Sequence, residues 1–175
     1  MQPDELLLRA RRFDVVRHYE TLPDGSVHTR ESVQHPGAVV ILPLVDDAHV
    51  CLIRNYRVAV KETLIELPAG TLELGEDPAE TARRELIEET GYRAEKIALL
   101  SEFFMSPGIL NERMRLYLAT GLTAGDTARE PGENIQNLVV PWDEAMAMVT
   151  DGRIRDAKTL VGLLLYDRMR TLTGT

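Results

Sequence analysis

The sequence predicts an α+β fold, in which a mixed β-sheet is combined with a few helices. Strand and helix patterns are mixed along the chain and do not alternate regularly, which argues against a series of parallel βα units. Residues 38–45 form a nearly continuous apolar run, as expected of a strand buried on both faces. Residues 77–91 carry the clearest helix signals: Asp77 suits the N-cap, Pro78 the first helical position and Gly91 the helix end.

Turn residues and apolar patterning predict the other elements. Further strands are expected at residues 12–20, 26–33, 49–56, 62–67, 98–104, 114–120 and 135–140, and further helices at 142–149 and 159–169. A His-Pro-Gly break at residues 35–37 separates the first two strands from the rest. We therefore expect residues 1–37 to form an N-terminal β-strand arm and residues 38–175 to form the main domain.

Composition excludes several classes of protein. The net charge of −8 argues against nucleic acid as a partner, because phosphate backbones require surplus Lys and Arg. No apolar run approaches the roughly 20 residues that a membrane helix needs, so we expect no membrane partner. Cys51 is the only cysteine, and the N-terminus lacks the pattern of a signal peptide. These features predict a cytoplasmic protein without disulfides.

The predicted helix at residues 77–91 carries a crowded acidic face. Glu85, Glu88 and Glu89 are spaced i, i+3, i+4 and share one side of the helix. Like charges at this spacing repel by a few tenths of a kcal/mol per pair, and Arg84 is the one cation within reach. A solvated helix face is the ordinary explanation of such a run. A bound divalent cation is the alternative, because Mg²⁺ prefers oxygen ligands.

The residues around the acidic face favour the metal-binding interpretation. Gly70 is followed after five residues by Glu76, and after seven more by Arg84-Glu85-Leu86-Ile87-Glu88-Glu89-Thr90-Gly91. Seven fixed identities at this spacing should occur by chance in roughly one such chain in a million. The pattern resembles the Nudix box. The resemblance implies the Nudix fold, a mixed β-sheet sandwiched between helices, and the hydrolysis of nucleoside diphosphates linked to a variable group.

Matching positions in the box imply the metal site. The resemblance assigns Glu85, Glu88, Glu89 and the backbone carbonyl of Ala69 as ligands, with Mg²⁺ as the expected ion and Mn²⁺ as the alternative. Arg84 is expected to hold the glutamates in place by ion pairing. Arg84 and Glu88 are accordingly two of the three residues assigned to catalysis.

The third catalytic residue is expected outside the box. Other segments of this chain resemble the ADP-ribose pyrophosphatase branch of the family. In that branch, a loop before the last strand often carries the general base. Here that loop covers residues 125–134, and Glu133 is the first choice because it directly precedes the strand from residue 135. Glu130 is the second choice.

Segments outside the box resemble the ADP-ribose pyrophosphatase branch of the family. They are the Arg-Asn-Tyr-Arg run at residues 54–57, the approach to the box at residues 64–70, and Pro107, fifteen residues past Tyr92. The resemblance implies substrate contacts by Arg57, Arg54, Glu66, Pro107 and Glu112. Arginine suits a diphosphate because its guanidinium can donate two parallel hydrogen bonds.

The expected reaction is the hydrolysis of ADP-ribose to AMP and ribose 5-phosphate. A pyrophosphatase for another nucleotide sugar, such as GDP-mannose or UDP-glucose, is the first alternative, because only base and sugar contacts would differ. A non-catalytic ADP-ribose sensor is a remote alternative, since the chain keeps every acidic position of the box. The resemblance also implies a homodimer to which the N-terminal strands contribute.

Overall fold

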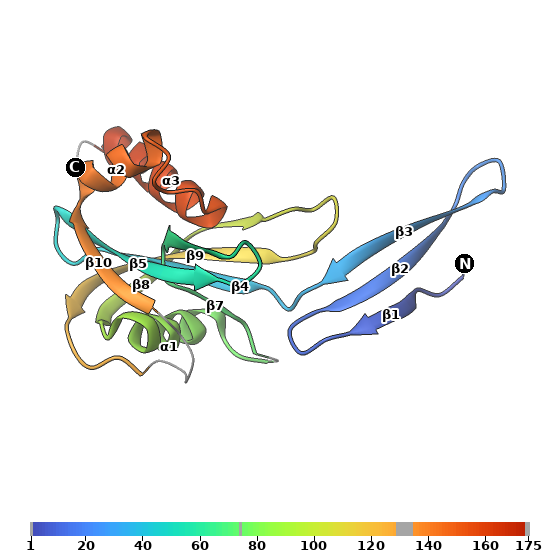
Figure 1. Ribbon diagram of the computed structural model, residues 1–175, viewed down its shortest axis with the longest axis horizontal. Coiled ribbons are helices and arrows are strands. Elements are labelled where there is room, and N and C mark those ends of the chain that lie inside the picture. Colours follow the sequence, from blue (N-terminus) through green and yellow to red (C-terminus); the bar gives the residue numbers. More distant parts are fainter. Residues whose placement is uncertain (1, 74, 129–134, 174–175) are drawn as a thin grey trace.

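The computed structural model describes residues 2–73, 75–128 and 135–173 (Figure 1). The strands are β1 (Glu5–Arg9), β2 (Asp14–Thr21), β3 (Val27–Gln34), β4 (Ala38–Pro43), β5 (His49–Arg57), β6 (Glu62–Glu66), β7 (Ala69–Thr71), β8 (Arg93–Phe104), β9 (Arg113–Thr123) and β10 (Ile135–Pro141). The helices are α1 (Pro78–Thr90), α2 (Trp142–Thr150) and α3 (Ala157–Thr173). The α+β class predicted from the sequence is confirmed.

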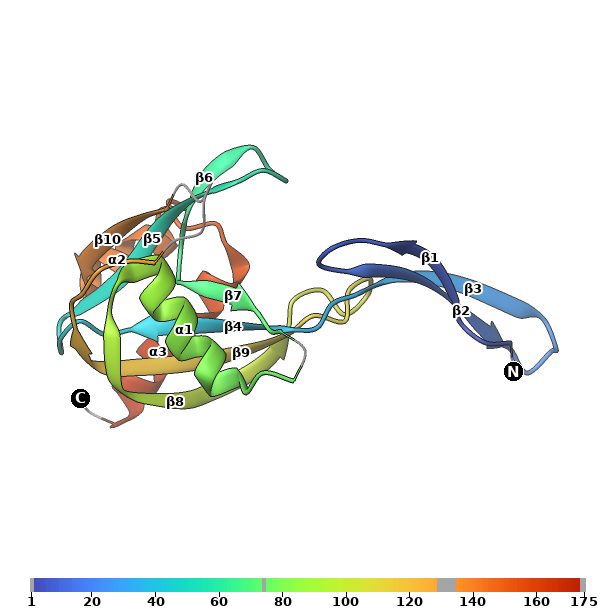
Figure 2. The same ribbon diagram turned by 90° about the horizontal axis from the view of Figure 1, so that it is seen from below.

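Two sheets form the main body. One has the strand order β7-β4-β9-β8 and the other the order β10-β5-β6. The first sheet is mixed, because β4 pairs parallel with β9 and antiparallel with β7. Helix α1 covers one side of the body, and α2 and α3 cover the other (Figures 1 and 2). No helix in the described part of the chain is long and apolar enough to cross a membrane.

Strand β4 is buried on both faces, as its apolar run predicts. Val40 and Leu42 belong to the larger hydrophobic core, which also contains residues of β5, α2 and α3. Val39 and Ile41 point the other way, into a smaller core shared with α1 and β9. Alternate side chains of one strand therefore join the two cores. This arrangement fixes β4 in the middle of the main body, with β7 beside it at the edge of the sheet.

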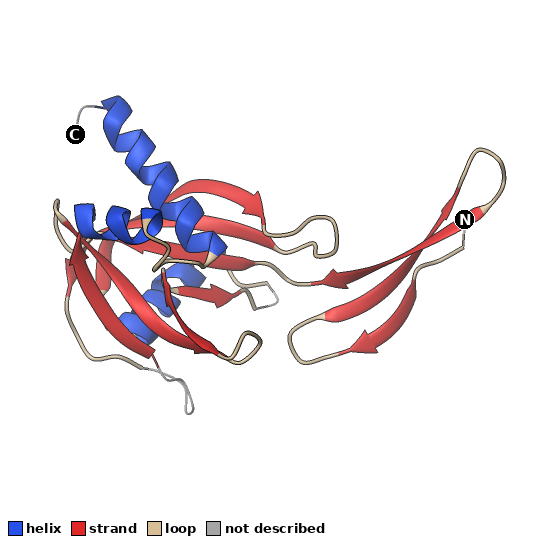
Figure 3. Ribbon diagram, turned by 45° about the horizontal axis from the view of Figure 1, so that its top comes forward, coloured by secondary structure: helices blue, strands red, loops and turns tan. Residues whose placement is uncertain are grey.

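The first three strands form a separate sheet that extends away from the body (Figures 1 and 3). None of the residues in these strands is buried, and Leu6, Leu8 and Val27 are each about half exposed. The base of this arm is tied to the body, because Val33 and Asn111 are joined by a backbone hydrogen bond. The first two predicted strands are present. Strand β1 was not predicted, since its three consecutive leucines show no period-2 alternation.

Two further details differ from the sequence prediction. Strand β8 begins at Arg93, five residues earlier than expected, because residues 93–97 pair with the end of β9 in a long antiparallel hairpin. Residues 69–71 form the short strand β7 on the edge of β4. Both extensions rest on pairing with distant strands, which local patterning does not reveal.

Helix α1 ends at a glycine that tolerates no side chain. Gly91 has a φ of 79°, and a Cβ on it would lie 2.4 Å from the carbonyl oxygen of Gly125. We expect Gly91→Ala to lower the free energy of unfolding by about 2–4 kcal/mol, since backbone strain and a steric clash add. Gly152 is the matched control: its φ is 80°, but the surrounding space is open. Gly152→Ala should cost only about 1 kcal/mol from strain. Equal losses in urea unfolding would contradict this account.

Candidate active site

Helix α1 is oriented by its N-cap and by its apolar side. The Asp77 carboxylate accepts hydrogen bonds from two backbone N–H groups of the first turn, which starts the helix as predicted. Leu86 is fully buried in the smaller core. With that side packed on the sheet, the helical repeat turns the face carrying Glu85, Glu88 and Glu89 toward β7 and the space beside it.

One arginine compensates much of the charge on this face. The Arg84 Nη1 atom lies 2.8 Å from a carboxylate oxygen of Glu85 and 2.9 Å from one of Glu88. Its Nε atom lies 3.0 Å from Glu76. The hydrogen bond from Arg84 lowers the pKa of Glu76, and the same contact raises the pKa of Arg84. A single guanidinium is therefore shared by three carboxylates, and Glu89 adds a fourth acidic group nearby.

Strand β7 lies directly against the acidic face. A Cβ on Gly70 would come within 1.9 Å of the carboxyl carbon of Glu85, so only glycine leaves room for that carboxylate. One carboxylate oxygen of Glu89 accepts a hydrogen bond from the backbone N–H of Ala69 at 3.0 Å, and Glu89 is only 5% exposed. The backbone of β7 and two glutamates of α1 thus meet at one place.

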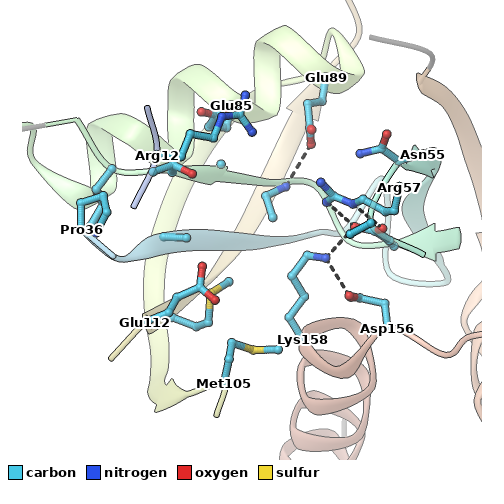
Figure 4. Close-up of a pocket in the computed structure, with 18 of the residues that line it drawn as sticks. Arg12, Pro36, Asn55, Arg57, Glu85, Glu89, Met105, Glu112, Asp156 and Lys158 are labelled. Atoms are coloured by element: carbon cyan, nitrogen blue, oxygen red, sulfur yellow. Dashed lines mark hydrogen bonds and ion pairs between the residues drawn. The ribbon is translucent and has the colours of Figure 1, made fainter. Parts of the chain in front are cut away.

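A cavity of about 750 Å³ opens beside this meeting point (Figure 4). Gly70 and the three glutamates of α1 line one part of it, here called the acidic wall, and Arg57 of β5 and Lys158 of α3 line another part, here called the basic wall. The arm also reaches the cavity, because Arg11 and Arg12 in the turn between β1 and β2 line it. The cavity therefore has an acidic wall that suits cations and basic groups that suit an anion.

The basic wall is organised around Glu66, which is fully buried. Arg57 donates two hydrogen bonds to it, from Nε at 2.8 Å and from Nη2 at 2.6 Å. Lys158 donates a third at 2.5 Å. Burial alone would raise the pKa of Glu66, but the hydrogen bond from Arg57 and the charge of Lys158 outweigh it and lower that pKa. Glu66 is thus held ionised beneath the cavity.

The other residues that the sequence nominated are dispersed. Glu112 lines the main cavity, with its carboxylate 3.4 Å from the His35 ring. Pro107 instead lines a second cavity of about 340 Å³, between the arm and residues 104–111. Arg54 is exposed on β5 and lines neither cavity. Glu133 lies outside the described residues.

Sequence reasoning missed several charged contributors to the cavity, among them Arg11, Arg12, Asp156 and Lys158. A signal existed for one of them, since Asp156 precedes Thr159 by three residues at a helix start and accepts a hydrogen bond from its backbone N–H. Nothing local indicates that Lys158 lies beside Glu66, which is 92 residues earlier in the chain.

The acidic wall has the donor chemistry of a divalent-cation site. The carboxylates of Glu85 and Glu89 lie next to the backbone of β7, which can supply carbonyl oxygens. Hard cations prefer such oxygen ligands. In the described part of the chain, no three His, Cys, Asp or Glu side chains already converge on one cation position. The reason is visible in the contacts: Arg84 bridges Glu85 and Glu88, while Glu89 faces the N–H of Ala69. The carboxylates of α1 and the backbone of β7 line the same cavity and supply hard oxygen donors, so the donor set fits the ion.

A mixed sheet between helices, with an acidic helix and a glycine-containing strand at a polar cavity, gives the chain a site suited to divalent cations and an anionic ligand. The chain belongs to the NUDIX family, because the model of the NUDIX domain matches residues 33–161.

Several named relatives match most of the chain. A methanol dehydrogenase activator of Bacillus methanolicus is 38% identical, covering 81% of this chain and 78% of its own. An ADP-ribose pyrophosphatase of Bacillus subtilis is 39% identical, and the match covers 79% of this chain and 76% of the relative. A GDP-mannose pyrophosphatase of Klebsiella pneumoniae is 38% identical, and the match covers 83% of this chain and 79% of the relative. A crystal structure described as an ADP compounds hydrolase superposes with a TM-score of 0.85 at 26% identity, covering 98% of this chain and 94% of that one.

The arginine at the centre of the acidic face should be needed for stability when no cation is bound. In metal-free buffer, we expect Arg84→Met to lower the free energy of unfolding by about 1–2 kcal/mol, because neighbouring carboxylates lose their shared counter-charge. Arg83→Met, on the same helix, is the control: it removes a 3.5 Å contact with exposed Glu80 and a hydrogen bond to the carbonyl oxygen of Ala94, and it leaves the acidic cluster intact. It should cost less than Arg84→Met, about 0.5–1 kcal/mol. Equal losses for the two variants in denaturant titrations would contradict the role of Arg84.

Proposed function

We propose that this protein is a Mg²⁺-dependent pyrophosphatase that hydrolyses ADP-ribose to AMP and ribose 5-phosphate. The observation that carries the proposal is that one cavity of about 750 Å³ is lined both by the carboxylates of α1 and by Arg57 and Lys158. A diphosphate needs both, because cations held by the carboxylates and guanidinium groups can share its negative charge.

The residues of the acidic wall are proposed to have different roles, in metal binding and in positioning. Glu85, Glu89 and the carbonyl oxygen of Ala69 would hold Mg²⁺, with Glu88 as a further ligand, and Mn²⁺ could replace Mg²⁺ at the same oxygens. Bound Mg²⁺ supplies charge neutralisation of the diphosphate and lowers the pKa of a coordinated water. Arg84 keeps Glu85 and Glu88 in place. Glu133 is proposed to accept the proton of the attacking water.

The basic wall and Glu112 are proposed to bind the substrate. Arg57 would donate to the diphosphate, and Glu112 stands near enough to the cavity to contact a ribose hydroxyl. Pro107 lines the second cavity, and Arg54 is exposed on β5. Within one chain, neither residue lines the main cavity. We therefore assign the diphosphate to Arg57 and not to Arg54.

The choice of ADP-ribose rests on two lines of support. The relative from Bacillus subtilis is named for ADP-ribose, and the similar crystal structure is described by ADP compounds. GDP-mannose is the second candidate, because a relative of nearly equal identity is named for it. The two substrates share the diphosphate and differ in base and sugar, so the walls described above serve either one.

We further propose that the protein is a cytoplasmic homodimer. The arm sheet has no buried residue of its own, and apolar side chains such as Leu6, Leu8 and Phe13 are at least 40% exposed. A three-stranded sheet with an uncovered apolar surface is marginal in water. A second copy of the chain would cover it.

The proposed reaction is tested with a panel of ADP-ribose, GDP-mannose and UDP-glucose in Mg²⁺, with products separated by chromatography. ADP-ribose should give AMP and ribose 5-phosphate with the highest kcat/KM. Preference for a guanine or uracil sugar would move the assignment to the alternative. Binding of ADP-ribose without hydrolysis of any substrate would support a sensor. Glu89→Gln should bind ADP-ribose but lose nearly all turnover.

Gly70 should be required for activity more than for stability. In Gly70→Ala the new methyl group would displace the Glu85 carboxylate, which is the flexible end of a side chain. We expect kcat/KM to fall by roughly 100-fold, because a misplacement of about 1 Å at a catalytic site has that effect. Gly152→Ala controls for stability, since it introduces strain far from the acidic wall. An active Gly70→Ala enzyme would contradict the assignment of Glu85.

The arm should support association and substrate binding together. Deletion of residues before Val33 removes the uncovered apolar surface as well as Arg11 and Arg12 at the cavity. We expect a monomer in analytical ultracentrifugation and a KM raised by roughly tenfold. Leu8→Glu separates the two effects, because it charges the arm surface and leaves both arginines in place. A deletion variant that is monomeric and fully active would refute the contribution of the arm to the site.

A further inference from the structure

Glu66 links the cavity wall to the start of helix α3. Its carboxylate is fully buried and is contacted by Arg57 from the end of β5 and by Lys158 from the first turn of α3. Lys158 is itself held by Asp156, whose carboxylate lies 2.9 Å from Nζ. Two acidic and two basic groups thus form a connected row whose formal charges cancel.

The same helix start also fixes the backbone next to Glu66. The Thr159 hydroxyl donates to Asp156 at 2.6 Å and accepts a hydrogen bond from the backbone N–H of Leu67 at 2.8 Å. Residues 66–67 are therefore held to α3 both by a side-chain ion pair and by a backbone contact. Strand β6 and α3 cannot shift independently without breaking these bonds.

The network leaves part of Arg57 available to a ligand. Nε and Nη2 of Arg57 are used by Glu66, and among the described residues Nη1 has no hydrogen-bond partner. The Arg57 side chain is 39% exposed while that of Glu66 is not exposed at all. A guanidinium fixed on one edge presents its remaining N–H groups in a defined direction, which reduces the entropy lost on binding.

We propose that Glu66 and Lys158 are positioning residues that hold the Arg57 guanidinium for the substrate diphosphate. This inference rests on the proposed function, in which Arg57 contacts the diphosphate. It replaces the expectation that Glu66 itself contacts the substrate, because both of its carboxylate oxygens already accept hydrogen bonds within a buried network. Lys158 holds Glu66 from below, so that Arg57 does not compensate the buried charge alone.

Two possible roles of Glu66, orienting Arg57 or only lowering the positive charge of the basic wall, predict opposite changes in KM for Glu66→Gln. Glu66→Gln removes a negative charge from the basic wall, so a purely electrostatic wall would bind the anionic substrate more tightly. If Glu66 orients Arg57, the KM for the pyrophosphate substrate should instead rise, by roughly tenfold, with kcat changed less than about threefold. A KM that is unchanged or lower in a folded variant overturns the proposal.

Glu62→Gln provides the matched control. Glu62 lies on the same strand β6 and pairs with Arg155, just before α3, but both side chains are about half exposed. The same substitution therefore breaks an ion pair between the same two segments at the surface. We expect the KM and kcat of Glu62→Gln to match those of the wild type. A KM increase equal to that of Glu66→Gln would show a general effect of the β6–α3 contact and overturn the proposal.

A double-mutant cycle keeps the proposal testable if Glu66→Gln does not fold. Lys158→Met should raise KM in the wild-type background and have little further effect in an Arg57→Ala background, because both changes disable one contact. Additive KM effects would show that Lys158 does not act through Arg57. If the wild type hydrolyses none of the nucleotide sugars, the proposed function fails, and that outcome is distinct from additivity in an active enzyme.

Discussion

The organisation of the site depends on acidic side chains crowded around a single guanidinium. Glu76, Glu85 and Glu88 all contact Arg84, and Glu89 adds its charge at the N–H of Ala69. One positive charge cannot balance four negative ones, so the acidic wall retains a strong attraction for cations. The caps of α1, the burial of its apolar side and the absence of a side chain at residue 70 all bring these carboxylates to the same wall of the cavity.

The basic wall, which carries Arg57 and Lys158, needs compensation of positive charge. An unshielded cluster of arginine and lysine would repel itself, and an unpaired buried carboxylate would be costly by several kcal/mol. Glu66 resolves both, because it is buried where Arg57 and Lys158 meet and neutralises much of their charge. The basic wall is thus a balanced network with one exposed guanidinium edge. The two walls together are complementary to a diphosphate accompanied by cations.

Local patterns predicted the parts of the molecule that local forces determine. The bounds of α1 follow from Asp77 and Gly91, and the apolar run of β4 follows from its burial on both faces. Pairing between distant segments was not predictable in the same way. Strand β7 and the early start of β8 depend on partners elsewhere in the sheet, and the contact of Lys158 with Glu66 joins residues far apart in sequence. Spacing to the box nominated Pro107, yet the arm and the loop around it place this residue at a separate cavity.

The most direct test of the account is where cations bind beside the acidic wall. A crystal grown with Mn²⁺ and a non-hydrolysable ADP-ribose analogue allows the ions to be located by their anomalous scattering. The account predicts ions within coordination distance, about 2.0–2.6 Å, of Glu85, Glu89 and the carbonyl oxygen of Ala69, in contact with the diphosphate. A bound analogue with no ion beside Glu85 or Glu89 would contradict it.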